Sequence, residues 1–129
     1  MPQLTPSTLR IGRRYRASRL GGPYDAVWLS HILHGEGPEE CRGIVRKAAA
    51  ALVPGGVFLV HEFILDDAKD GPLYPALFSL NMLLGTPSGR SYAEGELRAL
   101  LEEVGIAGIR RLPMPPQVPS AILRGEKLR

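Results

Sequence analysis

The stretch Tyr24–Glu40, YDAVWLSHILHGEGPEE, limits most strongly what this chain can fold into. Its first part, Tyr24–Leu33, is continuously apolar after Asp25, which is typical of a strand buried on both faces of a sheet. Glycine at positions 35 and 37 and proline at 38 end the strand, and proline suits the first turn of a helix. The stretch therefore predicts a buried strand that ends near His34 and is followed directly by a helix.

The next segment continues this pattern. A helix is predicted over 38–52, because its apolar residues recur at helical spacing and so form one face. A turn at 54–56 separates it from a second predicted strand, VFLVHEFIL, at 57–65. Strand, helix and strand in this order imply a right-handed crossover and a parallel pair. The residues of the apolar helix face are Cys41, Ile44, Val45, Ala48, Ala49 and Leu52.

The remaining sequence predicts two helices and a hairpin. The segment 72–85 is apolar nearly all round, as expected of a buried or partner-facing helix. An amphipathic helix follows over 91–105, where Ser91 and Glu94 have the spacing of a capping box. Strands at 106–112 and 120–125, joined by a proline-rich turn, favour an antiparallel pair.

These elements predict an α/β fold with a partial Rossmann-like sheet. We expect about four strands, a parallel pair plus a C-terminal antiparallel hairpin, with flanking helices. Residues 1–23 form an arginine-rich lead-in and residues 24–129 form the folded unit. A bare strand at 24–33 would be an exposed edge, so we expect it to pair with another chain or to be covered by residues 1–20.

Composition excludes several classes of protein. Hydrophobic residues make up 44% of the 129 residues, which suffices for a core. No apolar run approaches the roughly 18 residues of a membrane span, and no secretory leader is visible. A single cysteine fits a cytoplasmic location. Five arginines precede the first acidic residue, but only Tyr15 could stack among them, so we favour a solvated segment over a nucleic-acid contact.

Two residues could carry chemistry at one rim of the sheet. His34 follows the first strand and Glu62 lies near the carboxyl end of the second, where ligands bind in open α/β sheets. A histidine held by a carboxylate is an oriented general base. Strand alternation sends His61 and Glu62 to opposite faces, so at most one of them can join His34. The alternative, a loop histidine and a strand-end glutamate that never touch, stays open.

Other chemistries are less favoured by the residues. His31 and His34 have the spacing H-x-x-H, but a strand sends residues three apart to opposite faces, so we expect no metal site. Cys41 lies on the apolar helix face and is expected to serve packing. The chain has neither a G-x-G-x-x-G nor a P-loop motif.

Several segments together resemble the C-terminal half of class I O-methyltransferases that use S-adenosylmethionine. The subgroup is the plant caffeate/flavonoid type with its bacterial polyketide and hydroxyneurosporene-type relatives. The resemblance covers residues 24–125 and rests on the order and spacing of its segments. They are YDAVWLSHILHGEGPEEC, LVPGGVFLVHEFIL, GPLYPALFSLNMLLGTPSGRSYAEGELRALLEEVGI and the closing hairpin.

The resemblance implies roles for individual residues. It implies that His34 deprotonates a small phenolic or enolic substrate hydroxyl and that Glu62 orients His34. It also implies that Ser30 and His31 border the cofactor S-adenosylmethionine. The implied substrate wall consists of Met82, Phe78 and Tyr74.

Some features of that family are missing from this sequence. The glycine-rich strand–loop that cradles the cofactor is absent, and Ser91 stands where the family has a second catalytic glutamate. Two functions therefore remain open. The chain is either an O-methyltransferase domain or a non-catalytic, truncated methyltransferase-like module. Such a module would self-associate as a homo-oligomer, for example a dimer, or complete a partner chain that supplies the missing strands.

Overall fold

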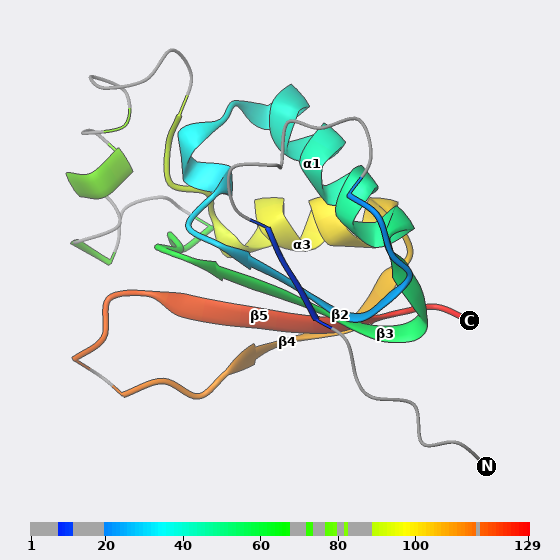
Figure 1. Ribbon diagram of the computed structural model, residues 1–129. Coiled ribbons are helices and arrows are strands. Elements are labelled where there is room, and N and C mark those ends of the chain that lie inside the picture. The colour runs from blue at the N-terminus through cyan, green and yellow to red at the C-terminus, as the bar shows by residue number, and fades with distance from the viewer. Residues whose placement is uncertain are drawn as a thin grey trace.

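A five-stranded mixed sheet forms the centre of the fold (Figure 1). The computed structural model describes residues 8–11, 20–67, 72–73, 77–79, 82, 89–115 and 117–129. The strand order is β1-β2-β3-β5-β4; the first three strands are parallel, and β5 is antiparallel to both β3 and β4. The α/β class, the parallel pair and the hairpin are therefore confirmed. The strands are β1 (Thr8–Ile11), β2 (Tyr24–Ser30), β3 (Leu52–Glu62), β4 (Ile106–Leu112) and β5 (Ala121–Lys127).

Strand β1 is the one strand that the sequence did not predict. It lies in the arginine-rich lead-in and pairs in parallel with β2, from Thr8 opposite Ala26 to Ile11 opposite Leu29. The expectation that residues 1–20 cover the edge of the first predicted strand is thus confirmed. The cover is a backbone ladder, which satisfies the amide and carbonyl groups that a bare edge would expose.

The crossover between β2 and β3 contains helix α1 (Pro38–Ala50), close to the predicted range. Strand β3 begins earlier than predicted, at Leu52, because the Gly-containing turn forms a bulge within the strand. The register shifts from Tyr24 opposite Leu52 to Ala26 opposite Val57. A Cβ atom at Gly56 would lie 2.6 Å from Leu52 Cδ1 and 2.9 Å from the Asp25 carbonyl oxygen, so the bulge requires glycine there.

Helix α3 spans Glu94–Glu103, and its start differs from the predicted one. The side chain of Glu96 accepts a hydrogen bond from the amide of Ala93 at 2.9 Å, so the cap lies two residues beyond the predicted Ser91 and Glu94 pair. Ser91 is instead buried, with 2% of its surface exposed. Ala93 has no side-chain acceptor, so only the glutamate half of a capping box is present, and it lies at Glu96 rather than at the predicted Glu94.

Helices α1 and α3 pack on the same face of the sheet (Figure 1). Val27 and Leu29 of β2 point to that face and are fully buried, whereas Trp28 and Ser30 on the opposite face are half-buried. The prediction that this strand is buried on both faces was therefore wrong in the part of the chain that the structure describes. The core beneath the helices includes Phe58, which is 0% exposed.

The predicted helix at 72–85 lies largely outside the described residues. Its described members 73, 77–79 and 82 have helical backbone, and Leu73 and Leu77 are exposed. Among the described residues, no helix is both long and apolar enough to cross a lipid bilayer.

Candidate functional site

The rim of the sheet at the carboxyl ends of β2 and β3 is shaped by an early end to β2. The strand ends at Ser30, and His31 takes a positive φ of 54°. A short 3-10 helix, η2 (Leu33–Gly35), then turns the chain back toward β3. The sequence placed the end of this strand near His34. The strand instead ends four residues earlier, at Ser30, because the positive φ of His31 breaks the extended backbone.

His34 and Glu62 meet at this rim, as predicted. Nδ1 of His34 lies 2.8 Å from Oε2 of Glu62, and Oε1 of Glu62 accepts a hydrogen bond from the amide of Leu33 at 3.0 Å. The Glu62 side chain is 4% exposed and that of His34 is 16% exposed. Because an ionised carboxylate only accepts hydrogen bonds, this contact assigns a proton to Nδ1 of His34, and in the neutral ring the lone pair is then on Nε2. The open alternative, in which the two residues never touch, is excluded by this contact.

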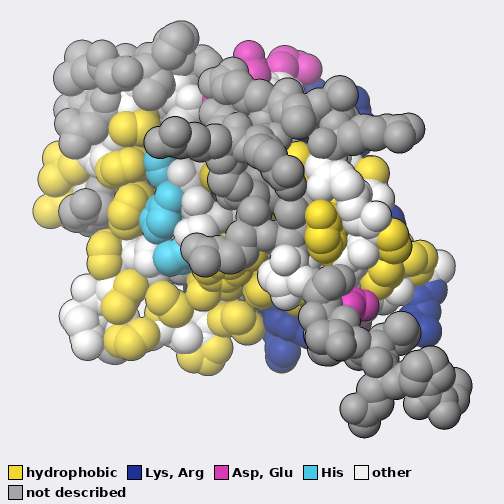
Figure 2. Space-filling view, viewed as in Figure 1, with side chains coloured by type: hydrophobic (Ala, Val, Ile, Leu, Met, Phe, Trp, Pro, Cys, Tyr) yellow, Lys and Arg dark blue, Asp and Glu magenta, His cyan; other side chains and the backbone are white. Residues whose placement is uncertain are grey.

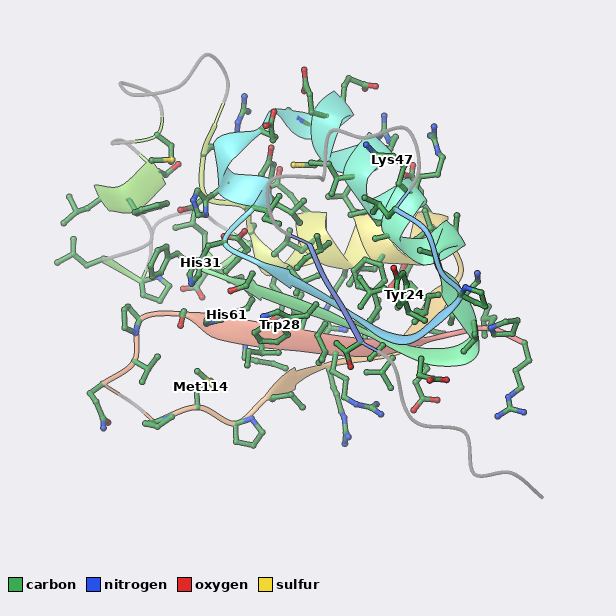
Figure 3. All side chains as sticks on the ribbon, in the orientation of Figure 1. Tyr24, Trp28, His31, Lys47, His61 and Met114 are labelled. Carbon is green, nitrogen blue, oxygen red and sulfur yellow. The ribbon has the colours of Figure 1, made fainter. Side chains whose placement is uncertain are left out.

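His61 points to the other face, as strand alternation predicted. Its Nδ1 lies 3.0 Å from Oγ of Ser30, and its Nε2 lies 2.8 Å from Oγ of Ser120. Its ring also stacks on Trp28, with the ring centroids 5.5 Å apart (Figure 3). His61 therefore links β2, β3 and the start of β5, and the Ser30 hydroxyl is part of this link.

His31 lies beside the His34–Glu62 pair, contrary to the expectation that His31 and His34 occupy opposite faces. Because the strand has already ended, their ring centroids are 5.8 Å apart. Nδ1 of His31 is 4.0 Å from Oε2 of Glu62 and has no hydrogen-bond partner among the described residues. Burial lowers the pKa of His31, and the nearby Glu62 carboxylate only partly offsets this effect. The chain's three histidines form one column on the surface, flanked by hydrophobic side chains (Figure 2).

Aromatic side chains surround the His34 ring. Phe78 meets it edge-on at 4.8 Å between centroids, and Phe63 lies 4.6 Å from Phe78. The residue expected beside them, Met82, is half-buried on helical backbone, and the expected Tyr74 lies outside the described residues. Phe78, one of the three predicted wall residues, thus contacts His34.

Several groups that sequence reasoning did not assign to the site hold the η2 turn in place. The buried thiol of Cys41 donates to the Leu33 carbonyl at 3.3 Å, and the hydroxyl of Tyr92 donates to the Glu36 carbonyl at 2.6 Å. The amide of Arg90 donates to the His34 carbonyl at 2.8 Å. Burial raises the pKa of Cys41 to about 11, so it stays a neutral thiol, in agreement with the predicted packing role. No sequence pattern signals these contacts, since all three end on backbone carbonyl oxygens.

A cavity at this rim lies on the hairpin side. It has a volume of about 430 Å³, and Ile64, Ser120 and the β4–β5 connection line it, but His34 does not. Arg111 and the Ser120 hydroxyl give it polar groups at the edge of an otherwise apolar wall. The cavity is therefore separate from the face on which His34 meets Phe78.

Comparison with known proteins identifies the family of this fold and site. The O-methyltransferase domain family matches residues 12–107. The 3-hydroxy-5-methyl-1-naphthoate 3-O-methyltransferase of Streptomyces sahachiroi is 36% identical over 111 residues, which cover 86% of this chain and 32% of that protein. The chain thus spans about a third of the length of this relative.

Two solved structures of related proteins have the same fold as this chain. PigF with SAH superposes with a TM-score of 0.75 at 33% identity, covering 84% of this chain and 31% of PigF. An O-methyltransferase family 2 protein of Planctomyces limnophilus in complex with apigenin superposes with a TM-score of 0.73 at 28% identity, covering 91% of this chain and 34% of that protein. From the family match, the relative and the shared fold together, we conclude that the chain belongs to the O-methyltransferase domain family.

Proposed function

We propose that this chain provides the substrate side of an S-adenosylmethionine-dependent O-methyltransferase that acts on a small aromatic or enolic hydroxyl. His34 is the general base and Glu62 is the residue that positions it. The observation that carries the proposal is the 2.8 Å contact between Nδ1 of His34 and the buried carboxylate of Glu62.

This contact supports a base at Nε2 of His34. Glu62 holds the Nδ1 proton, so the lone pair on Nε2 is available to a substrate hydroxyl. The second hydrogen bond to Glu62, from the Leu33 amide, fixes the carboxylate and hence the ring orientation. When the hydroxyl gives up its proton, the ring becomes an imidazolium, and the adjacent carboxylate stabilises that charge.

Among the described residues, only the carboxyl end of β2 would lie beside the cofactor. S-adenosylmethionine supplies an electrophilic methyl group when bound, and the carboxyl end of β2 would lie beside it through Ser30 and His31. The Ser30 hydroxyl is already bonded to His61, and the His31 ring packs on Phe63 at 4.8 Å between centroids. The sequence has no glycine-rich strand–loop, so these residues support a substrate-side role and do not make a full cofactor cradle.

The surroundings of His34 and the names of the relatives support the proposed substrate class. The rings of Phe63 and Phe78 offer an apolar, aromatic wall, which suits a planar aromatic alcohol. The Streptomyces relative is named for a hydroxynaphthoate, and the Planctomyces protein was solved with apigenin. A phenolic hydroxyl is also acidic enough for an imidazole to deprotonate as the methyl group is transferred.

The test separates cofactor binding from base chemistry. S-adenosylmethionine is titrated calorimetrically into the purified chain, and methyl transfer to hydroxynaphthoates and flavonoids is then measured. His34→Ala should lower transfer by about 10²- to 10⁴-fold, the usual contribution of a general base, while the affinity for the cofactor stays the same. Equal transfer by His34→Ala and the unsubstituted chain would overturn the assignment of the base.

A second candidate function is favoured by the missing glycine-rich loop and by the sheet face that α1 and α3 do not cover. In this alternative the chain is a non-catalytic module that self-associates or completes a partner chain. The absence of heat on adding S-adenosylmethionine at high micromolar concentration would favour this alternative for the chain alone.

A further inference from the structure

The groups His31, His34 and Glu62, here called the histidine–glutamate cluster, have features that a base function does not use. Each offers one ligand atom, and the three atoms lie within 4.8 Å of one another. Nδ1 of His31 is shielded from solvent and has no hydrogen-bond partner among the described residues. Its backbone is also held at a φ of 54°, which is strained for a residue other than glycine. A bound ion would use the lone pair of this buried nitrogen and would explain why it has no hydrogen-bond partner.

We propose that the histidine–glutamate cluster binds a transition-metal dication of the zinc type, and that the bound ion prevents His34 from accepting a proton. The metal site stands on the geometry alone, whereas the effect on a base rests on the proposed function. The ligands are Nδ1 of His31, Nδ1 of His34 and Oε2 of Glu62. Imidazole nitrogen with one carboxylate suits zinc, and zinc sites with three protein ligands keep a fourth position for water.

The distances fit such an ion with small adjustments. Zinc–ligand bonds of about 2.0–2.1 Å in a tetrahedron place the ligand atoms about 3.3 Å apart. Oε2 of Glu62 lies 2.8 Å from Nδ1 of His34 and 4.0 Å from Nδ1 of His31. These two separations lie on either side of the required value, and all three ligand atoms lie within 4.8 Å of one another, so the two imidazoles would have to move toward a common centre to hold the ion. The side chain of His31 is 34% exposed, which gives an ion and its water a route to solvent.

Among the described residues, the cluster offers these three ligands. The amide of Leu33 occupies Oε1 of Glu62 and so directs Oε2 toward the two histidines. His61 contacts the His31 ring at 4.5 Å between centroids, but both of its nitrogens are bonded to serine hydroxyls. His61 is therefore not a ligand of the ion. As a histidine next to the cluster, it can serve as a control in the test below.

Metal binding changes the tautomer of His34. Without metal, Nδ1 carries a proton that it donates to Glu62, and Nε2 has the lone pair. Coordination through Nδ1 requires the lone pair on that atom, so the proton moves through solvent from Nδ1 to Nε2 and none is lost overall. The ring then presents an N–H group to the substrate. It cannot take up the hydroxyl proton until the ion leaves.

The test measures metal binding without any turnover. The untagged full chain, freed of metal, is titrated with Co²⁺, whose visible absorption reports tetrahedral coordination, and Zn²⁺ is then added to displace it. We expect one ion per chain. His31→Asn should weaken binding by at least about tenfold, while the matched control His61→Asn should bind like the unsubstituted chain. Asparagine tolerates a positive φ, so His31→Asn keeps the local backbone, which circular dichroism checks.

Imidazole ¹⁵N NMR supplies the second measurement. Zinc should move the His34 proton from Nδ1 to Nε2, and a chelator should reverse the change. Absence of stoichiometric Co²⁺ binding, equal losses in the His31 and His61 variants, or an unchanged His34 tautomer would each overturn the proposal. Metal binding as expected in a chain without methyl transfer would support the site while the proposed function failed.

Discussion

Replacing Glu62 by glutamine tests whether the carboxylate sets the tautomer of His34. The substitution keeps the size of the side chain and one carbonyl oxygen, which can still accept from the Leu33 amide. The amide NH₂ group then faces Nδ1 of His34, where the carboxylate stood at 2.8 Å. Two donors cannot share a hydrogen bond, so the His34 ring must move its proton to Nε2 or lose the contact.

The magnitude follows from the burial of the pair. A hydrogen bond to a charged group contributes about 1.5–3 kcal/mol, and a neutral one contributes about 0.5–1.5 kcal/mol. Glu62→Gln exchanges the first kind for the second, so the free energy of unfolding should fall by about 1–2 kcal/mol. If the chain transfers methyl groups, the wrong tautomer should lower the rate by about 10²-fold or more.

Two assays check this prediction in a buffer that contains a chelator. Imidazole ¹⁵N NMR should show the His34 proton on Nδ1 in the unsubstituted chain and on Nε2 in Glu62→Gln, and urea unfolding measures the loss in stability. Glu103→Gln makes the same chemical change at a side chain that is 51% exposed and paired with Arg42, so it should leave the His34 tautomer unchanged and cost less than about 1 kcal/mol. A His34 proton that stays on Nδ1 in Glu62→Gln, together with an unchanged free energy of unfolding, would refute the reasoning.

Three further substitutions test the packing and charges around the site by urea unfolding. Ser91→Ala removes a buried hydroxyl that has no partner among the described residues, so stability should stay the same or rise by about 1 kcal/mol; a clear loss would reveal a partner. Phe58→Ala empties a fully buried position and should cost about 3–5 kcal/mol; a loss below about 1 kcal/mol would contradict this burial. Burial alone would raise the pKa of Glu94, but hydrogen bonds from Arg111 and Arg98 outweigh it and lower the pKa below the ordinary 4.5. Glu94→Gln should therefore cost about 0.2–1 kcal/mol at neutral pH, and the difference should shrink as the pH falls below 4.5 toward the lowered pKa of the folded state; a difference that grows as the pH falls below 4.5 would contradict the sign.

Periodic patterns in the sequence predicted most of the fold. The helical spacing of Ile44, Val45 and Ala48 predicted the buried face of α1, and all three residues are buried. The strands β4 and β5 were predicted to within two residues, because the proline-rich turn separates two β-type runs. Strand β1 was not predicted, because its alternation of polar and apolar residues, TLRI, covers only four residues inside an arginine-rich segment. It became a strand only through pairing with the edge of β2.

The candidate site likewise has features that the sequence determined and features that only the tertiary structure decided. The sequence by itself determined that His34 and Glu62 follow parallel strands, and parallel strands bring their carboxyl ends to one rim. Tertiary structure alone decided the contacts made there: the positive φ of His31, the η2 turn and the amide of Leu33 on Glu62. The physical reason is that side-chain periodicity is a local property of the chain. Pairing of strand edges and of buried polar atoms depends instead on which distant groups remain to be satisfied once the sheet has formed.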